Sequence, residues 1–428
     1  MAKPTITITS KGHALTLTIR SLGLLVKLFK GEKWKHARQF AEDPQLMSWK
    51  DLIYFGYKYY CNPPETGKIN SLTASAPLSL NSTEKVTISI GGDLMPYELL
   101  TPRRTKNLWD ETGDFFFCSD IVFANLETPL DLSQKPSFVP EVMLNDMLFN
   151  TDEKTYSIFS GNNKYKGYDV LSIANNHSLD MKVTGLQNTI KYLSQKNILY
   201  VGASPNSEVF EKQESIIERN GIKIGFLAYT YSLNKSSVPD DMPWLVNHLK
   251  LNGHEPDLAL IKKQAADLRK KGAEILICSL HCGNAYQAFP NSNIVTLFKR
   301  VFEECNVDVI AGGHPHNIQP CGWHEWMQNG KTKKGFAIYS LADFIAWDIF
   351  TWCHLCAMLK ITVCRNKDGI AVLSEVEVKP CYMQLDKAGN LRLRDFDKLI
   401  SNPLPDATFS KSNLKEIDEL KRFYKLIK

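Results

Sequence analysis

The residues of this chain that are best suited to chemistry stand directly after short apolar runs. Asp93 follows the run 86–90, and His281 follows the run 275–280. The full set is Asp93, Asn125, Glu127, Asn176, His177, His281, His314 and His316. Carboxylates, an amide oxygen and imidazoles together form a mixed oxygen and nitrogen shell that suits Mn, Fe or Zn. These candidates exceed the needs of one four-coordinate ion, so the sequence predicts a site for two divalent metal ions.

Each of these residues also has an ordinary structural explanation when it is taken singly. An isolated aspartate such as Asp93 commonly caps a helix, the pair Asn175-Asn176 suits a turn, and a lone histidine is commonly a surface or core residue. Their repeated occurrence at strand ends favours a shared site, because ligands of open α/β sheets bind at the carboxyl ends of the strands. The other histidines lack this setting and are expected to be structural: His13, His36, His248, His254, His324 and His354.

The hydrophobic pattern predicts the elements that would position the candidate ligands. Short β-branched runs alternate with helix-like segments, which indicates an α/β fold. We expect strands at 86–90, 121–124, 170–174, 198–202, 224–229, 275–280, 307–311 and 336–341, with a closing pair at 355–363 and 371–379. We expect helices at 186–196, 256–271, 294–305 and 413–427. Glycine pairs at 91–92 and 312–313 are expected to let the backbone turn tightly beside the ions.

Length and composition bound the organisation of the chain. Its 428 residues, 43% hydrophobic and 23% charged, have the composition of a globular protein rather than of a fibrous or disordered one. We divide the chain into a basic N-terminal hairpin-plus-helices appendage (1–61), a linker rich in small and polar residues (62–84), a catalytic domain (85–390) and a C-terminal helical extension (391–428). Within the appendage, alternation between Ile6 and Ile19 suggests the hairpin, and 21–30 and 32–42 suggest helices.

Charge and apolar runs bound the partners and the location. The net charge of +5 is too small to indicate a nucleic-acid partner. The positive excess lies within residues 1–60, so docking of this segment on an acidic membrane surface or a protein partner is an alternative to a packed subdomain. The start shows no signal-peptide pattern, and no run approaches the roughly 20 apolar residues of a membrane span, so we expect a cytoplasmic protein. Its ten cysteines are then expected to be reduced, with Cys353 and Cys356 in the core.

Six sequence blocks carry a resemblance to a known family. They are Gly92-Asp93-Leu94-Met95, Asn125-Leu126-Glu127-Thr128-Pro129-Leu130, Ala174-Asn175-Asn176-His177-Ser178-Leu179-Asp180, His281-Cys282-Gly283, Gly313-His314-Pro315-His316 and Tyr339-Ser340-Leu341. In their order and spacing, residues 86 to about 350 resemble the CapA family, the poly-γ-glutamate or bacterial capsule synthesis proteins. That family is similar in fold to the calcineurin-like metallophosphoesterases, so the resemblance implies a two-sheet β-sandwich flanked by helices.

The resemblance also implies roles for individual residues. Two divalent ions would be held by Asp93, Glu127, Asn176, His281, His314 and His316. His177 matches the histidine that acts as a general acid or stabilises developing charge, and Asp180 would orient it. Asn125 would be a further ligand or a substrate contact. Met95 stands where the phosphoesterases carry another histidine ligand, so one ion would have fewer nitrogen ligands.

Three departures from the family pattern bear on catalysis and substrate binding. The block His281-Cys282-Gly283-Asn284-Ala285-Tyr286 lacks the usual Trp and Glu, which leaves Tyr286 as the candidate substrate contact there. Asp343 replaces the usual Asn and could be an added base, a ligand or a structural residue at a strand end. Lys182 replaces the usual Gly and could meet an anionic substrate or simply be exposed.

Three classes of function are compatible with these residues, and an enzyme is the leading one. In a metal-dependent hydrolase, a metal-bound hydroxide would attack a phosphoester or an amide such as a γ-glutamyl bond, with His177 protonating the leaving group. In a peptide epimerase, His177 and Asp343 would remove and return an α-proton. In an accessory protein, the chain would serve assembly of a capsule polymer such as poly-γ-glutamate. The expected substrate is anionic or peptide-like.

Overall fold

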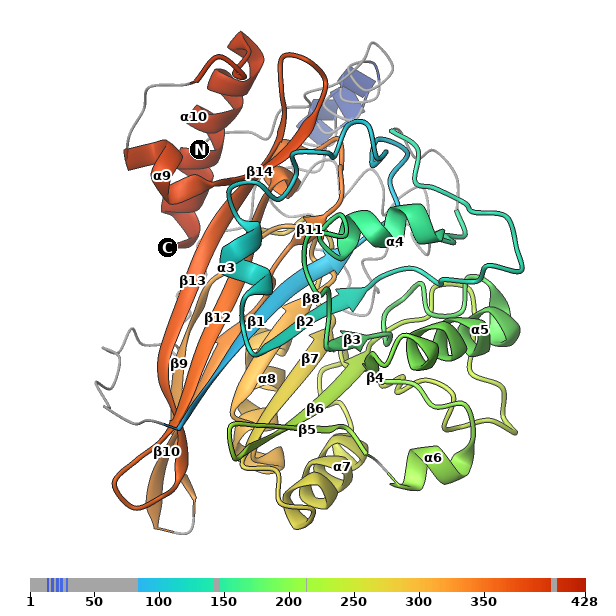
Figure 1. Ribbon diagram of the computed structural model, residues 1–428, viewed down its shortest axis with the longest axis vertical. Coiled ribbons are helices and arrows are strands. Elements are labelled where there is room, and N and C mark those ends of the chain that lie inside the picture. Colours follow the sequence, from blue (N-terminus) through green and yellow to red (C-terminus); the bar gives the residue numbers. More distant parts are fainter. Residues whose placement is uncertain are drawn as a thin grey trace.

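The computed structural model describes residues 84–428, apart from 142–146, 213, 329 and 402–405, together with some helical positions between residues 14 and 29. Two β-sheets form its centre, and helices lie around them (Figure 1). The expected α/β fold with two sheets flanked by helices is therefore confirmed.

The first sheet contains eight strands in the order β14-β13-β12-β1-β2-β3-β4, with β11 paired to β1. Their bounds are β1 (Lys85–Leu94), β2 (Ile121–Leu126), β3 (Val170–Ser172), β4 (Leu199–Val201), β11 (Asp343–Ile345), β12 (Leu355–Arg365), β13 (Ala371–Leu385) and β14 (Leu391–Asp395). Strands β1 to β4 run parallel to one another, whereas β12 is antiparallel to β1. The carboxyl ends of β1, β2 and β3 therefore lie along one edge of this sheet.

The second sheet contains six strands in the order β5-β6-β7-β8-β10-β9. Their bounds are β5 (Ile216–Arg219), β6 (Ile222–Thr230), β7 (Ile275–His281), β8 (Val309–Gly313), β9 (Cys321–Gln328) and β10 (Lys331–Ile338). Strands β6, β7, β8 and β10 run parallel. Their carboxyl ends bring the segments after β7 and β8 together.

The helices pack on these sheets through their apolar faces. They are α3 (Gly113–Phe117), α4 (Glu153–Phe159), α5 (Lys182–Gln195), α6 (Ser207–Lys212), α7 (Ala259–Lys270), α8 (Ser292–Cys305), α9 (Phe396–Ser401) and α10 (Lys411–Ile427), with a short 3₁₀ helix η2 (Thr351–His354). Helix α8 begins after Asn291, whose side chain accepts hydrogen bonds from two backbone N–H groups, and ends at Asn306 in the left-handed region.

Alternating side chains along β6 contribute to two cores. Leu227 and Tyr229 are buried with residues of α7 and α8. Ile224 and Phe226 face the first sheet, and the Phe226 ring lies 5.5 Å from that of Phe123 on β2. This alternation follows from the pleat of the strand and fixes the two sheets face to face.

Each strand and helix expected between residues 86 and 427 is present, with boundaries shifted by a few residues. Strands β5, β9, β11 and β14 were not anticipated. The short β11 has only three residues and depends on pairing with β1, so a local hydrophobic pattern could not reveal it.

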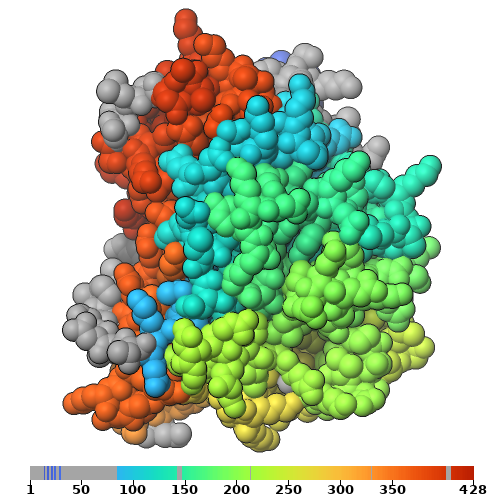
Figure 2. Space-filling model, in the orientation of Figure 1, coloured from blue at the N-terminus to red at the C-terminus, as the bar shows by residue number. Residues whose placement is uncertain are grey.

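The segment 391–428 differs from the expected separate helical extension. It begins with β14, which pairs with β13 and continues the first sheet. The backbone N–H of Leu391 donates to the Arg104 carbonyl, and Leu420 and Phe423 of α10 are buried in the main core. In Figure 2 this segment, red, lies directly against the cyan part of the chain. Strand pairing and apolar burial therefore make it part of the same folded unit as the residues before it.

The N-terminal division lies largely outside the described residues, including the linker at 62–83. Leu17 and Thr18 are helical, so the second strand of the expected hairpin is not present at these positions. Within the described part of the chain, none of the helices is both long and apolar enough to cross a membrane. The nine described cysteines are free, and Cys353 and Cys356 are buried as expected.

Candidate metal centre

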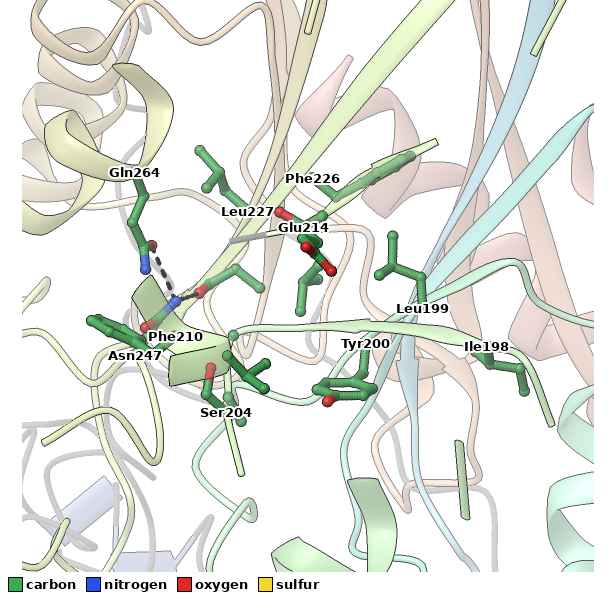
Figure 3. A pocket seen from close by; sticks show the side chains of 16 residues that line it. Ile198, Leu199, Tyr200, Ser204, Phe210, Glu214, Phe226, Leu227, Asn247 and Gln264 are labelled. Carbon is green, nitrogen blue, oxygen red and sulfur yellow. Dashed lines mark hydrogen bonds between the residues drawn. The ribbon is translucent and has the colours of Figure 1, made fainter. Parts of the chain in front are cut away.

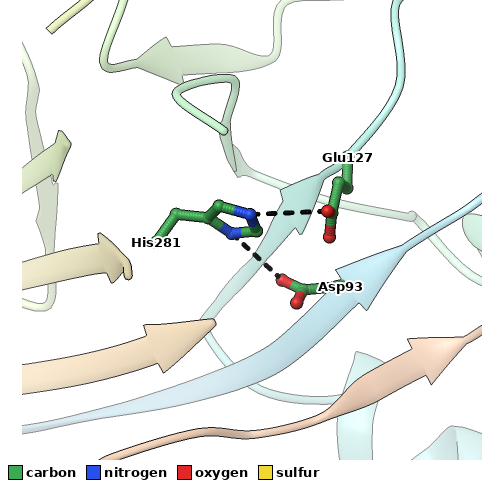
Figure 4. A group of neighbouring side chains, drawn as sticks. All are labelled: Asp93, Glu127 and His281. Atoms are coloured by element: carbon green, nitrogen blue, oxygen red, sulfur yellow. Dashed lines mark ion pairs between the residues drawn. The ribbon is translucent and has the colours of Figure 1, made fainter. Parts of the chain in front are cut away.

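The candidate ligands from the two sheets meet at the carboxyl ends of the parallel strands. Asp93 is the second-to-last residue of β1, Glu127 follows β2, and His281 ends β7. Figure 4 shows these three side chains turned toward one another, and one ligand atom of each lies within 4.8 Å of the others. The distance is 3.4 Å from His281 Nε2 to Glu127 Oε1 and 3.8 Å from His281 Nδ1 to Asp93 Oδ1. All three are buried, so the group is enclosed.

Two asparagines bind to this group through their side-chain amides. The Oδ1 atom of Asn176 lies 2.7 Å from His281 Nε2. The Asn125 amide donates to Asp93 Oδ1 at 2.8 Å and lies 3.3 Å from His281 Nδ1. Asn175 in turn donates to Asn125 Oδ1 and to the backbone carbonyl of Leu126, which fixes the turn after β3 against the end of β2.

The two histidines after β8 complete the group. The backbone N–H of His314 donates to Asp93 Oδ2 at 2.9 Å, and its ring lies 5.2 Å from the His281 ring. His316 contacts Asp343 Oδ1 through Nδ1 at 2.7 Å. His314 and His316 have φ angles of 93° and 58°, a region that non-glycine residues rarely adopt, so the surrounding contacts hold strained backbone here.

Several ligand atoms of this group are buried and lack hydrogen-bond partners. They are both carboxylate oxygens of Glu127, Nδ1 of His314 and Oδ2 of Asp343. An ionised carboxylate that is buried without a partner costs several kcal/mol. Divalent cations would satisfy these atoms, and the carboxylate and imidazole donors suit Mn, Fe or Zn. The residues present therefore fit the expected metals.

The ionisation of two members of the group favours metal binding, whereas His316 must first lose a proton, because, against the effect of burial, nearby carboxylates, Asp343 above all, raise its pKa to about 10. Burial opposes ionisation of Glu127, but attraction by His281, His316 and His177 together outweighs it and lowers the Glu127 pKa to about 2. Burial, followed by repulsion from His281, holds the His314 pKa well below its usual range. Burial and the charge of Glu127 raise the pKa of Asp93 to about 7. Metal ligands must be anionic carboxylates or neutral imidazoles, so Glu127 and His314 already have the required charge at neutral pH.

Two glycines allow close packing in and beside the ligand group. A Cβ atom on Gly313 would lie 2.7 Å from Asp93 Oδ1 and 3.2 Å from His281 Nδ1. A Cβ atom on Gly92 would lie 2.1 Å from the backbone oxygen of Ala342, where β11 approaches β1. These two glycines therefore permit close approach of backbone and ligands. They do not form the tight turns expected from the sequence, because Gly92 lies within β1 and Gly313 is the last residue of β8.

His177 lies beside this group and is held in one orientation. Its Nδ1 is 2.7 Å from Asp180 Oδ2, and its ring stacks on Phe149 with centroids 3.8 Å apart. Asp180 also accepts a hydrogen bond from the Phe149 backbone at 2.7 Å. Because Asp180 engages Nδ1, the ring orientation of His177 is fixed.

The remaining sequence candidates occupy different surroundings. Lys182 is exposed at the first residue of α5, and within the described residues no contact joins it to the buried ligand group. Tyr286 stacks on His316 with ring centroids 5.0 Å apart, and its hydroxyl donates to Asp348 Oδ2 at 3.1 Å. Met95 is buried in the main core. Tyr286 thus packs directly against a candidate ligand.

Sequence reasoning missed two residues near the candidate ligands, Tyr231 and Asp348. The Tyr231 hydroxyl lies 2.9 Å from His314 Nε2, so it orients that ring. Asp348 accepts a hydrogen bond from the hydroxyl of Tyr286, whose ring stacks on His316. Tyr231 follows β6 directly and carries the same strand-end signal as His281, whereas nothing in the sequence around Asp348 marks it.

A cavity of about 250 Å³ lies away from the ligand group, between β4 and β6. Figure 3 shows its apolar wall of Tyr200, Phe210 and Phe226, with Asn247 and Gln264 on one side. Asn247 Nδ2 donates to Gln264 Oε1 at 3.3 Å. Its lining includes none of the candidate ligands, so this cavity is distinct from the metal centre.

These features define a two-sheet α/β protein with a buried group of carboxylate, amide and imidazole side chains, candidate metal ligands, at the carboxyl ends of both sheets. The chain belongs to the bacterial capsule synthesis protein family, PGA_cap, whose profile matches residues 87–347. The resemblance carried by the six sequence blocks is therefore confirmed.

Individual relatives are distant in sequence. The chain is 26% identical over 329 residues to a capsule biosynthesis protein CapA of Bacillus anthracis, covering 73% of this chain and 74% of the relative. It is 23% identical over 306 residues to a PGA biosynthesis protein CapA of Bacillus subtilis strain 168, covering 69% and 73%.

Solved structures with similar chains include two enzymes. The NAD nucleotidase NadN of Haemophilus influenzae matches with a TM-score of 0.41 and 14% identity over 79% of this chain and 67% of that one. The calcineurin-like phosphoesterase YfkN of Bacillus subtilis matches with a TM-score of 0.39 and 12% identity over 79% and 99%.

Proposed function

We propose that this chain is a metal-dependent hydrolase that cleaves a phosphoester or an amide of the γ-glutamyl type in an anionic or peptide-like substrate. The observation that carries the proposal is the Glu127 carboxylate, which is fully buried and has no hydrogen-bond partner on either oxygen. Such a group is stable when cations bind it, and it lies among other donor atoms from both sheets.

Asp93, Glu127, Asn176, His281, His314 and His316 would hold the ions. Divalent metals in such a site supply Lewis acidity and lower the pKa of water. Asn125 donates to Asp93 and would position that ligand. Asp343 contacts His316 Nδ1, so we assign it to positioning this ligand rather than to proton abstraction.

His177 would donate the proton to the leaving group. It is the immediate neighbour of Asn176, and it is buried with Asp180 on its Nδ1. The Asp180 carboxylate would stabilise the protonated ring and keep its other nitrogen directed at the substrate. Stacking on Phe149 restricts rotation of the ring during this transfer.

The names of the two CapA relatives favour a polyanionic substrate, because they refer to capsule and PGA biosynthesis. The same names support a second candidate function, an accessory role in assembly of such a polymer without catalysis. The epimerase alternative is the weaker of the two, because it needs Asp343 as a free base.

Metal content and hydrolysis, measured together on the full chain, test the proposal. We expect about two divalent metals per chain after reconstitution with Mn²⁺, together with hydrolysis of an aryl phosphate ester or a γ-glutamyl anilide. Glu127→Gln should lose metal and activity together. His177→Gln should keep the metal and lose about 10²- to 10⁴-fold in rate, whereas His254→Gln, a variant of a partly exposed histidine, should match the wild type.

Two results would contradict this function. Wild-type protein that takes up no metal would remove its basis. Metal-loaded protein that cleaves neither class of bond would instead favour the accessory role.

A further inference from the structure

A second group of metal-ligating side chains lies next to the candidate centre, in the segment from β11 to η2. One ligand atom each from Asp343, Asp348 and Cys353 lies within 4.8 Å of the others. Their residues are 3%, 7% and 3% exposed, so solvent does not screen the group. Asp348 and Cys353 belong to neither the predicted ligand set nor the proposed proton-transfer residues.

The hydrogen bonds of the two carboxylates leave ligand positions open. Asp343 uses Oδ1 for His316, while its Oδ2 is buried and has no hydrogen-bond partner. Asp348 accepts from the Phe350 backbone through Oδ1 at 2.9 Å, and through Oδ2 from the hydroxyls of Tyr286 at 3.1 Å and Tyr97 at 3.3 Å. Because each carboxylate oxygen has two lone pairs, Asp348 retains capacity for a further contact at Oδ1.

The Cys353 thiol is buried beside the two carboxylates. Cys353 Sγ donates to Asn317 Oδ1 at 3.3 Å, and Asn317 Nδ2 is itself buried without a partner. The loss of the thiol proton would leave an anionic sulfur beside this amide. Two carboxylates and one thiolate are the donors that a divalent cation of the zinc type accepts.

The group carries negative charge that few neighbours offset. Among the ion pairs of the described residues, none joins a lysine or arginine to Asp343 or Asp348, and His316 pairs with Asp343 alone. Two carboxylates this close in a low-dielectric interior repel strongly. A cation between them would reverse that repulsion.

We propose that Asp343, Asp348 and Cys353 form a third divalent-cation site, separate from the two-ion centre and specific for a thiophilic metal such as Zn²⁺. A tetrahedral zinc ion has ligand distances of about 2.0 to 2.3 Å, which place its ligand atoms about 3.5 Å apart. Side-chain movement of about 1 Å therefore closes the group on an ion. Asp343 would link this ion to His316, so the third site would brace one ligand of the main centre.

Cobalt substitution tests this site independently of catalysis. The six ligands proposed for the main centre include no sulfur, so a sulfur-to-cobalt charge-transfer absorption reports on the thiol site alone. Full-length protein loaded with Co²⁺ should show this band. Cys353→Ser should lose the band and about one equivalent of cobalt per chain. Cys356→Ser, a matched variant of a buried cysteine three residues away, should keep both.

The outcomes separate this site from the proposed hydrolase. Absence of the band in wild-type protein, or its persistence in Cys353→Ser, would overturn the third site. Loss of hydrolysis or of the other two metal equivalents with the band intact would contradict the hydrolase and leave the third site standing.

Discussion

Asp93 on β1 and Asp343 on β11 are direct partners across a parallel strand pair, although they lie far apart in the sequence. Asp93 accepts hydrogen bonds from Asn125 and from the His314 backbone, whereas Asp343 binds the ring of His316. The pairing brings the late segment 343–345 against the first strand of the sheet. Asp93 thus lies among the candidate ligands, and its strand partner Asp343 orients the candidate ligand His316.

Glu127→Gln is expected to remove metal-dependent stabilisation. Wild-type protein at a free Mn²⁺ concentration about 100 times its Kd should gain about 2.7 kcal/mol of unfolding free energy. Glu127→Gln should gain much less stability from Mn²⁺, because its uncharged amide replaces an anionic ligand. In metal-free buffer at neutral pH the variant should be less stable than wild type, because it loses the ion pair with His281 that helps to lower the Glu127 pKa.

Thermal unfolding with and without Mn²⁺ measures both effects. Glu304→Gln is the matched control, because Glu304 pairs with Arg300 on the exposed side of α8. An equal gain in Glu127→Gln and wild type would exclude Glu127 as a ligand.

Gly313→Ala is expected to weaken metal binding by about tenfold or more, the order seen when support of a metal ligand is lost. Its methyl group would displace Asp93 and His281, which a Cβ atom would approach to 2.7 Å and 3.2 Å. Titration calorimetry with Mn²⁺ measures the change. Gly253→Ala, whose Cβ would meet only a loop carbonyl, should bind as wild type does. Wild-type affinity in Gly313→Ala would show that the ligands have room to move.

Asp180→Asn is expected to lower kcat by about 10- to 100-fold, with KM and metal content unchanged. The amide no longer stabilises the charged His177 ring, although it retains a similar shape. Steady-state kinetics on the metal-loaded protein measure the effect, with the exposed Asp110→Asn as control. A parallel loss of metal would instead place Asp180 in support of the ligands.

The pair of His354 and Glu416 should make stability depend on pH. Burial alone would lower the pKa of His354, but Glu416 and the Asp348 carbonyl raise it above its usual range. The folded state therefore binds this proton more tightly than the unfolded chain. The resulting stabilisation is fully present below about pH 6.5 and is lost as pH rises through the folded-state pKa.

Glu416→Gln should cost about 3 to 5 kcal/mol of unfolding free energy at about pH 6, because it leaves a buried charge unpaired, and less at about pH 9. Denaturant unfolding at the two pH values measures the difference. Asp418→Asn, an exposed change on the same helix, should show no such dependence. An equal cost at both pH values would mean that His354 is neutral throughout.

The amino-acid sequence by itself determined the α/β alternation and most of the candidate ligands. Strand pattern and strand-end chemistry are local properties, so Asp93, Glu127 and His281 stood out before their distances were known. The family resemblance also implied that Asp180 would orient His177, and the two side chains lie 2.7 Å apart.

Only the tertiary structure decided how the late segments contribute. Strand β14 pairs with the preceding strand β13, its Leu391 bonds to the distant Arg104, and α10 packs on η2. These are tertiary contacts, which no local pattern reveals. For the same reason Tyr231 and Asp348 were missed, and Asp343 acquired a contact with His316. Pairing register and burial are properties of the folded chain, and they decide whether a polar residue at a strand end is a ligand, a support or an exposed side chain.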